Sequence, residues 1–280
     1  MAKKKANKDR EMSFLDHLED LRWHLIRAAL AIVVTGFVAF LAKGFIFDVV
    51  LFGPKQADFF TYEVLCYLSK NMGVDESFCF TELPFRIQSR KMAGQFSAHL
   101  WTSITAGFIV AFPYILYQFW SFVAPGMYSA EKKQARIFIF FSSILFFTGV
   151  VFGYYVICPL SINFLGGYQV SSEVFNDIDI GSYIGLVRAC TLASGLIFEL
   201  PIAIFYLTKF GIVTPDFLRQ NRKYAIVLIL IISAIITPPD IASQIIVAIP
   251  VVILYEISLL IAERIYKKQI KKNDKPSRRI

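Results

Sequence analysis

Residues 137–160 read IFIFFSSILFFTGVVFGYYVICPL and contain no Asp, Glu, Lys or Arg. A helix needs about 20 apolar residues to cross the hydrocarbon core of a bilayer, because each residue adds about 1.5 Å. Further apolar segments lie at residues 25–42, 100–123, 183–207, 224–236 and 243–262. The sequence therefore predicts an all-α integral membrane protein with six transmembrane helices.

The last two apolar segments are short, and the fifth is about 20 Å long as a helix. A re-entrant hairpin is an alternative to two spans. The turn ITPPDIAS at residues 236–243 contains two prolines, which end a helix and favour two short spans. Short spans imply local thinning of the bilayer or burial against neighbouring helices.

Composition supports the membrane class. Of the 280 residues 56% are hydrophobic and 18% are charged, below the roughly 25% that is typical of soluble domains. The formal net charge of +8 does not indicate a nucleic-acid partner, because the distribution of Lys and Arg between loops matters more in a membrane protein.

The basic residues predict the orientation of the chain. Lys and Arg gather before the first span, between spans two and three, between spans four and five, and after span six, whereas the connector 161–182 has none. Cytoplasmic loops carry such an excess, so both termini are expected in the cytoplasm. We expect a cytoplasmic segment with an amphipathic helix (1–24), a six-span membrane domain (25–262) that includes an outer loop (43–99), and a basic cytoplasmic tail (263–280).

The outer loop contains Cys66 and Cys79, on the side of the membrane where disulfides form. A bridge would stabilise the loop by about 3 kcal/mol, although two free thiols remain an alternative. Cys158 and Cys190 lie in spans and are expected to be packing residues.

No nucleotide-binding, metalloprotease or serine-hydrolase motif is present, so we expect no catalytic residue and no cofactor. His17 and His24 lie seven residues apart on one helical face with Asp20 between them. This spacing could hold a metal, but a polar helix face at the membrane boundary is the favoured interpretation, and no metal is expected.

Acidic residues stand out near the cytoplasmic ends of the spans. Asp16, Glu19 and Asp20 lie near the polar side of the amphipathic segment 13–26, SFLDHLEDLRWHLI. Glu131 lies in the next cytoplasmic loop. The alternative is that Glu131 only favours a helix start and that Asp20 is only solvated.

Glu199 lies well inside the fourth span, in SGLIFELPIAIF at residues 194–205. A carboxylate at the centre of a spanning helix costs about 2.5–3.5 kcal/mol on insertion scales. Pro201 would open the backbone ladder beside it. We infer that Glu199 lines a polar groove; a hydrogen-bonded carboxyl between helices is the alternative.

Several blocks together resemble the TatC family, the six-span subunit of the twin-arginine protein translocase. They are HLEDLRWHLI (17–26), YQFWSFVAPGMYSAEKK (117–133), FELPI (198–202), GIVTPDFLRQNRKY (211–224) and TPPDIASQ (237–244). The resemblance implies a receptor for signal peptides that carry an Arg-Arg pair. It implies a subunit of a hetero-oligomer with the single-span partners TatA and TatB, in the lipid of a bacterial inner membrane. Such complexes export folded proteins and are driven by the proton-motive force.

The resemblance also assigns candidate roles at the matched positions. The signal-peptide-binding residues would be Asp20 with its neighbour Glu19, Glu131 and Phe122. Glu199 and Gln244 would line the intramembrane polar groove, and structural or assembly roles would fall on Pro54, Pro113, Gln118 and Asp240. The guanidinium groups of two arginines prefer planar carboxylate partners, and Asp20 and Glu131 could supply them if spans one to three pack together.

The chain departs from the family pattern at several places. Asp20 stands where glutamate is usual, His24 where arginine is common and Arg188 where an apolar residue is expected, and the first outer loop is enlarged. Two functions of other classes remain as alternatives. One is a proton-coupled small-molecule transporter that uses Glu199, and the other is a membrane scaffold that does not recognise peptides.

Overall fold

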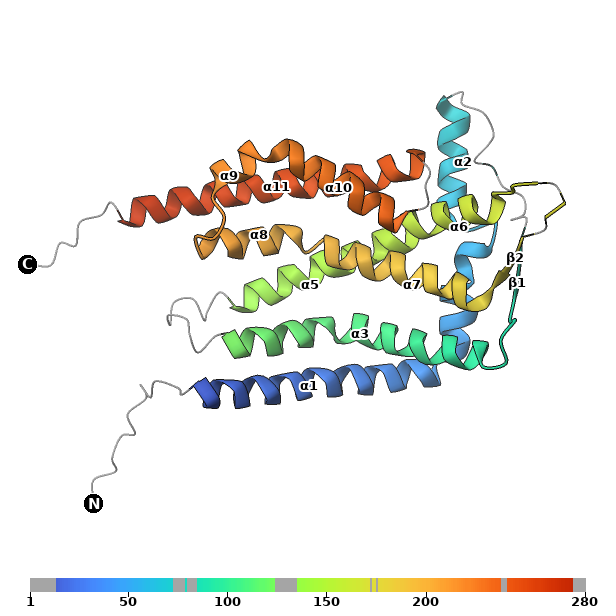
Figure 1. Ribbon diagram of the computed structural model, residues 1–280, viewed down its shortest axis with the longest axis horizontal. Helices are drawn as coiled ribbons and strands as arrows, with labels where there is room; N and C mark the ends of the chain where they lie inside the picture. Colours follow the sequence, from blue (N-terminus) through green and yellow to red (C-terminus); the bar gives the residue numbers. More distant parts are fainter. Residues whose placement is uncertain are drawn as a thin grey trace, which may run out of the picture.

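In the computed structural model the long helices run roughly along one direction (Figure 1). The structure describes residues 14–72, 79, 85–123, 135–171, 173–174, 176–237 and 241–273. The α-helices are α1 (Phe14–Leu41), α2 (Phe60–Met72), α3 (Gly94–Val123), α5 (Ala135–Phe152), α6 (Cys158–Gly167), α7 (Ile180–Ile197), α8 (Leu200–Lys209), α9 (Pro215–Gln220), α10 (Arg222–Ile236) and α11 (Ile241–Asn273). The shorter elements are the π-helical segments η1 (Phe45–Leu51) and η5 (Gly153–Ile157), the 3₁₀ turn η2 (Gly53–Lys55) and the strands β1 (Arg86–Gln88) and β2 (Asp177–Asp179).

The helical membrane class is confirmed. Within the described ranges, five helical segments are long and apolar enough to cross a bilayer: His17–Leu41, Gly94–Val123, Ile137–Gly167, Ile180–Lys209 and Ser243–Lys267. The predicted fifth span forms α10, whose 15 residues extend about 22 Å beside α11. It is therefore shorter than the other five. Helix α1 begins at the same end of the bundle at which helix α11 finishes (Figure 1).

Two spans differ from their predicted form. The fourth is interrupted at Phe198 and Glu199, so that it consists of α7 and α8. Pro201 at the start of α8 lacks the amide hydrogen that a continuous helix requires. The sixth continues as α11 to Asn273, beyond the predicted boundary at residue 262, because no glycine or proline follows to stop it there.

Helices α1 and α3 approach each other most closely where Gly36 faces Gly107. A Cβ atom on Gly107 would lie 2.6 Å from the backbone nitrogen of Gly36, so no larger residue fits at this crossing. The Thr35 hydroxyl donates a hydrogen bond of 2.9 Å to the Gly107 carbonyl. Small residues allow helix backbones to meet closely in a membrane, where dispersion contacts and interhelical hydrogen bonds hold helices together.

The rest of the bundle packs around buried aromatic contacts, and an exposed ion pair joins its last two helices. Phe146 of α5 is fully buried, and its ring stacks on Phe112 of α3 with centroids 3.5 Å apart. Helix α7 packs against both α3 and α5, and α8 packs against α11. Arg222 at the start of α10 pairs with Glu256 of α11 at 2.5 Å.

A small sheet joins two loops that the all-helical prediction left irregular. Strands β1 and β2 pair in parallel, with Ile87 opposite Ile178. Asp179 then caps α7, accepting hydrogen bonds from the backbone N–H groups of Arg90 (3.2 Å) and Gly181 (2.9 Å). These bonds lower the pKa of the Asp179 carboxyl, so the cap is complete at neutral pH and is lost only as the pH falls through that lowered pKa.

The long loop after η2 contains α2. Cys66 of α2 and Cys79 form a disulfide, with their Cα atoms 4.7 Å apart. The Tyr62 hydroxyl donates hydrogen bonds to the carbonyls of Pro54 (3.0 Å) and Pro159 (3.1 Å). Burial raises the pKa of Tyr62, so its hydroxyl keeps the proton that both bonds need. Cys158 and Cys190 are buried and free, as packing residues would be.

The crossing of α1 and α3 predicts a strong positional effect of one methyl group. Gly107→Ala should push the helices apart and destabilise the protein by about 1–3 kcal/mol, as overpacked cores do. Gly185→Ala is the matched control, because a Cβ there meets nothing within 4 Å. Thermal unfolding in detergent would measure both variants. A Gly107→Ala variant as stable as Gly185→Ala would contradict the packing described.

Candidate functional site

The beginning of α1 meets the end of α3 through Phe122. The Phe122 ring stacks on His17 with centroids 4.4 Å apart and lies edge-on to His24 at 6.4 Å. The two histidines are two helical turns apart on the side of α1 that faces α3. They therefore hold Phe122 against α1 at this end of the bundle.

Gln118 lies one turn before Phe122 on α3 and is only 4% exposed. Its side-chain carbonyl accepts a hydrogen bond of 2.7 Å from Nδ1 of His24. This bond gives His24 a specific role in joining the two helices. Within the described residues, no group of three His, Cys, Asp or Glu side chains is placed to hold a metal ion.

Asp20 and Glu19 are both exposed near the start of α1. Helical geometry places Asp20 about 50° from the line through His17 and His24, and Glu19 about 150° from it. Asp20 thus flanks the contact with Phe122, whereas Glu19 points to the opposite side of the helix. Glu131, the other predicted partner for arginine, lies in the segment 124–134, outside the described residues.

Glu199 sits at the interruption between α7 and α8. Its Oε2 accepts a hydrogen bond from the hydroxyl of Ser142, a fully buried residue of α5. Its Oε1 is also buried and has no hydrogen-bond partner in the part of the chain that the structure describes. Glu199 therefore joins two spans through one oxygen, as the alternative of a hydrogen-bonded carboxyl between helices expects. The polar groove remains a prediction.

The other predicted positions are dispersed over the bundle. Gln244 donates a hydrogen bond of 3.1 Å to the Leu230 carbonyl of α10, and no hydrogen bond between described residues joins it to Glu199. Pro54 is buried in η2, and Pro113 is half-buried inside α3. Asp240 lies in 238–240, outside the described residues.

Arg188 is half-buried in α7, about 16 Å along the helix axis from Glu199. Its Nε atom is buried and has no hydrogen-bond partner among the described residues. The two charged residues of this span therefore do not neutralise each other.

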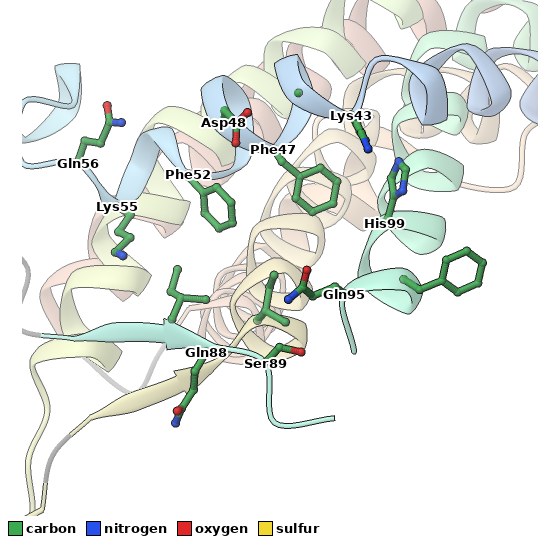
Figure 2. A pocket seen from close by; sticks show the side chains of 14 residues that line it. Lys43, Phe47, Asp48, Phe52, Lys55, Gln56, Gln88, Ser89, Gln95 and His99 are labelled. Atoms are coloured by element: carbon green, nitrogen blue, oxygen red, sulfur yellow. The ribbon is translucent and has the colours of Figure 1, made fainter. Parts of the chain in front are cut away.

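A cavity of about 900 Å³ lies at the opposite end of α1 and α3 (Figure 2). Lys43 at its rim is about 35 Å along α1 from Asp20, so the cavity is separate from the site around Phe122. Apolar and polar side chains share its lining: Lys43, Gly44, Phe47, Asp48, Phe52, Lys55, Gln56, Ile87, Gln88, Ser89, Gln95, Phe96, His99 and Ile180.

The sequence reasoning missed the ring cluster of His17, His24 and Phe122 and the donor to Glu199. The seven-residue spacing of the histidines was the signal for the ring cluster. That spacing also fits a metal site or a polar helix face, which are the two interpretations given above. Ser142 carried no such signal, because a serine in an apolar span has no visible partner in one sequence.

The geometry defines a multi-span helical membrane protein in which the exposed carboxylate of Asp20 lies beside the contact of Phe122 with His17, at one end of the bundle. Residues 16–250 match the family model "Sec-independent protein translocase protein (TatC)". The chain belongs to the TatC family. It is a translocase component, which transports proteins and is not an enzyme.

Relatives of known name agree with this assignment along nearly the whole chain. The Sec-independent protein translocase protein TatC of Blattabacterium sp. subsp. Periplaneta americana is 39% identical over 94% of this chain and 99% of the relative. TatCy of Bacillus subtilis is 34% identical over 96% of this chain and 94% of the relative. A crystal structure of the twin arginine translocase receptor TatC superposes with a TM-score of 0.66, at 31% identity, covering 89% of this chain and 99% of that one.

The bond to Glu199 predicts different consequences for two adjacent serines. Ser142→Ala would leave both carboxyl oxygens of Glu199 without a donor, and should destabilise the protein by about 1–3 kcal/mol. Ser143→Ala is the matched control, because among the described residues the Ser143 hydroxyl bonds only to the Ile139 carbonyl of its own helix. Thermal unfolding would compare the two. Equal losses would show that the Ser142 bond contributes nothing specific.

Proposed function

We propose that this chain is the signal-peptide receptor and core subunit of a twin-arginine translocase. In this role it binds the signal peptide of a folded cargo protein, and export proceeds with TatA-type and TatB-type single-span subunits and the proton-motive force. Membership of the TatC family is the observation that supports the proposal most strongly.

The arginine pair would bind at the end of the bundle where α1 begins and α3 ends. Asp20 is exposed and makes no hydrogen bond or ion pair with the described residues, so its carboxylate is free to accept a guanidinium. Glu131, which follows α3 in the sequence, would supply the second carboxylate. Arginine fits such carboxylates better than lysine does, because its planar group can donate two parallel hydrogen bonds.

Phe122 and Glu199 would serve the rest of the peptide. Phe122 is the last residue but one of α3, and its aromatic ring is half-buried against His17. The apolar part of the peptide would then follow the bundle toward Glu199, whose second oxygen remains without a partner among the described residues. A conformational step in the membrane would use this carboxyl after the peptide has bound.

The proposed orientation places both termini in the cytoplasm of a bacterial cell, with the chain in the inner membrane. Six crossings, with α10 as the short fifth, are consistent with α1 beginning and α11 ending at one end of the bundle (Figure 1). Among the described residues, Arg22 near the start of α1 and Arg264 and Lys267 near the end of α11 lie toward that end, as expected for the cytoplasmic side.

Binding of a synthetic signal peptide to the purified chain in lipid nanodiscs tests the receptor proposal. Asp20→Asn and Glu131→Gln should each weaken binding of the Arg-Arg peptide about tenfold, because each removes one charged hydrogen-bond partner. Glu19→Gln is the matched control and should bind normally, since Glu19 faces away from Phe122. Fluorescence anisotropy with a labelled peptide would provide the affinities.

Glu199→Gln should bind the peptide normally and lower export by membrane vesicles, because the amide retains a hydrogen-bond acceptor but cannot carry a charge. Unchanged affinity in both Asp20→Asn and Glu131→Gln would refute the proposed peptide site. Wild-type export by Glu199→Gln would assign Glu199 a purely structural role.

A further inference from the structure

Helix α2 runs across the direction of the spans, at the end of the bundle where α1 ends and α7 begins (Figure 1). The spans define the membrane normal, so α2 lies roughly parallel to the membrane surface. Its 13 residues extend about 20 Å in this direction. The helix therefore lies near one boundary of the bilayer.

The two faces of α2 differ sharply in exposure. Thr61, Tyr62 and Ser69 are buried, at 9%, 2% and 6% exposure. The opposite face carries Phe60, Val64 and Tyr67, exposed to 64%, 38% and 69%. These three residues are spaced i, i+4 and i+7, so they form one continuous apolar stripe along the helix.

Contacts with the third span show which way this stripe faces. The Phe60 ring lies edge-on to the Tyr155 ring of η5, with centroids 6.3 Å apart. The buried Tyr62 instead bonds to the carbonyl of Pro159, which comes later in the same span and therefore nearer its outer end. The buried face of α2 thus packs on the backbone of the third span at Tyr155 and Pro159, and the stripe begins beside the exposed ring of Tyr155.

The stripe continues an exposed apolar surface of the third span. Tyr155 is 40% exposed and shares one side of the third span with Val151 (54%) and Phe147 (37%). Exposed apolar side chains on a spanning helix contact lipid chains. Phe60 extends this lipid-facing side onto α2, and Tyr67 at the other end has the apolar body and polar tip typical of the headgroup region.

Helix α2 is held to the third span near its N-terminal end, which sets the direction of the stripe there. Near the N-terminal end the Thr61 hydroxyl donates to the Tyr155 carbonyl, and in the second half the disulfide ties Cys66 to Cys79. Glu63 and Lys70 are exposed to one side of the stripe, as expected for the polar flank of an interfacial helix.

We propose that α2 is a membrane-surface helix that inserts Phe60, Val64 and Tyr67 into the boundary between headgroups and acyl chains. The partner is the phospholipid of the leaflet at the end of the bundle away from the start of α1. The helix anchors the enlarged loop on the bilayer, and this role is independent of how the chain recognises its cargo.

Site-specific photocrosslinking to lipid tests this proposal with the full-length chain. p-Benzoylphenylalanine would replace Val64 on the stripe and, as the matched control, Lys70 on the polar flank. A third chain would carry it at Val151 on the lipid-facing side of the third span. Each would be purified, reconstituted in nanodiscs of phosphatidylethanolamine and phosphatidylglycerol, illuminated, and analysed by intact-protein and peptide mass spectrometry.

We expect phospholipid adducts at positions 64 and 151, with at least fivefold less adduct at position 70. Lipid adducts at position 151 without any at position 64 would overturn the proposal. Equal adduct formation at positions 64 and 70 would also overturn it, because a fixed stripe must distinguish the two faces. Crosslinks from position 64 mainly to a second copy of the chain would show that the stripe is instead a protein interface.

Discussion

The close crossing of α1 and α3 at Gly36 and Gly107 is the constraint on which the candidate site depends. Only 6% of the spanning part of α1 is buried, so α3 provides most of what holds this helix in place. One hydrogen bond lies on each side of the crossing. On one side His24 bonds to Gln118, and on the other Nε2 of His99 donates to the Phe40 carbonyl at 3.0 Å. The position of Asp20 relative to α3 follows from this packing.

Polar side chains inside the bundle join helices through hydrogen bonds. A buried polar group without a partner costs free energy in a membrane, so the hydroxyls of Thr35 and Ser142 bond across helix pairs. Glu199 is satisfied at only one oxygen within the described residues. In the proposed function this second oxygen is the part of the carboxyl that a partner or a proton would engage.

The positions of the long spans could be predicted from apolar runs, because a bilayer demands about 20 apolar residues from each helix. Pro201 likewise indicated the interruption beside Glu199. The parallel strands could not be predicted, since three residues carry no periodicity and the strands pair across distant loops. The bond of His24 to Gln118 was equally hidden, because local sequence does not report which spans are neighbours. Glu131 remains a prediction from resemblance.

The central claim is that an arginine pair binds beside Asp20, at the end of the α1–α3 contact. Photocrosslinking from position 20 in native membranes tests it most directly, using signal peptides that carry Arg-Arg or Lys-Lys at otherwise identical positions. The account predicts a strong crosslink to the Arg-Arg peptide and a much weaker one to the Lys-Lys peptide. Equal crosslinking of both peptides, or none of either, would contradict it.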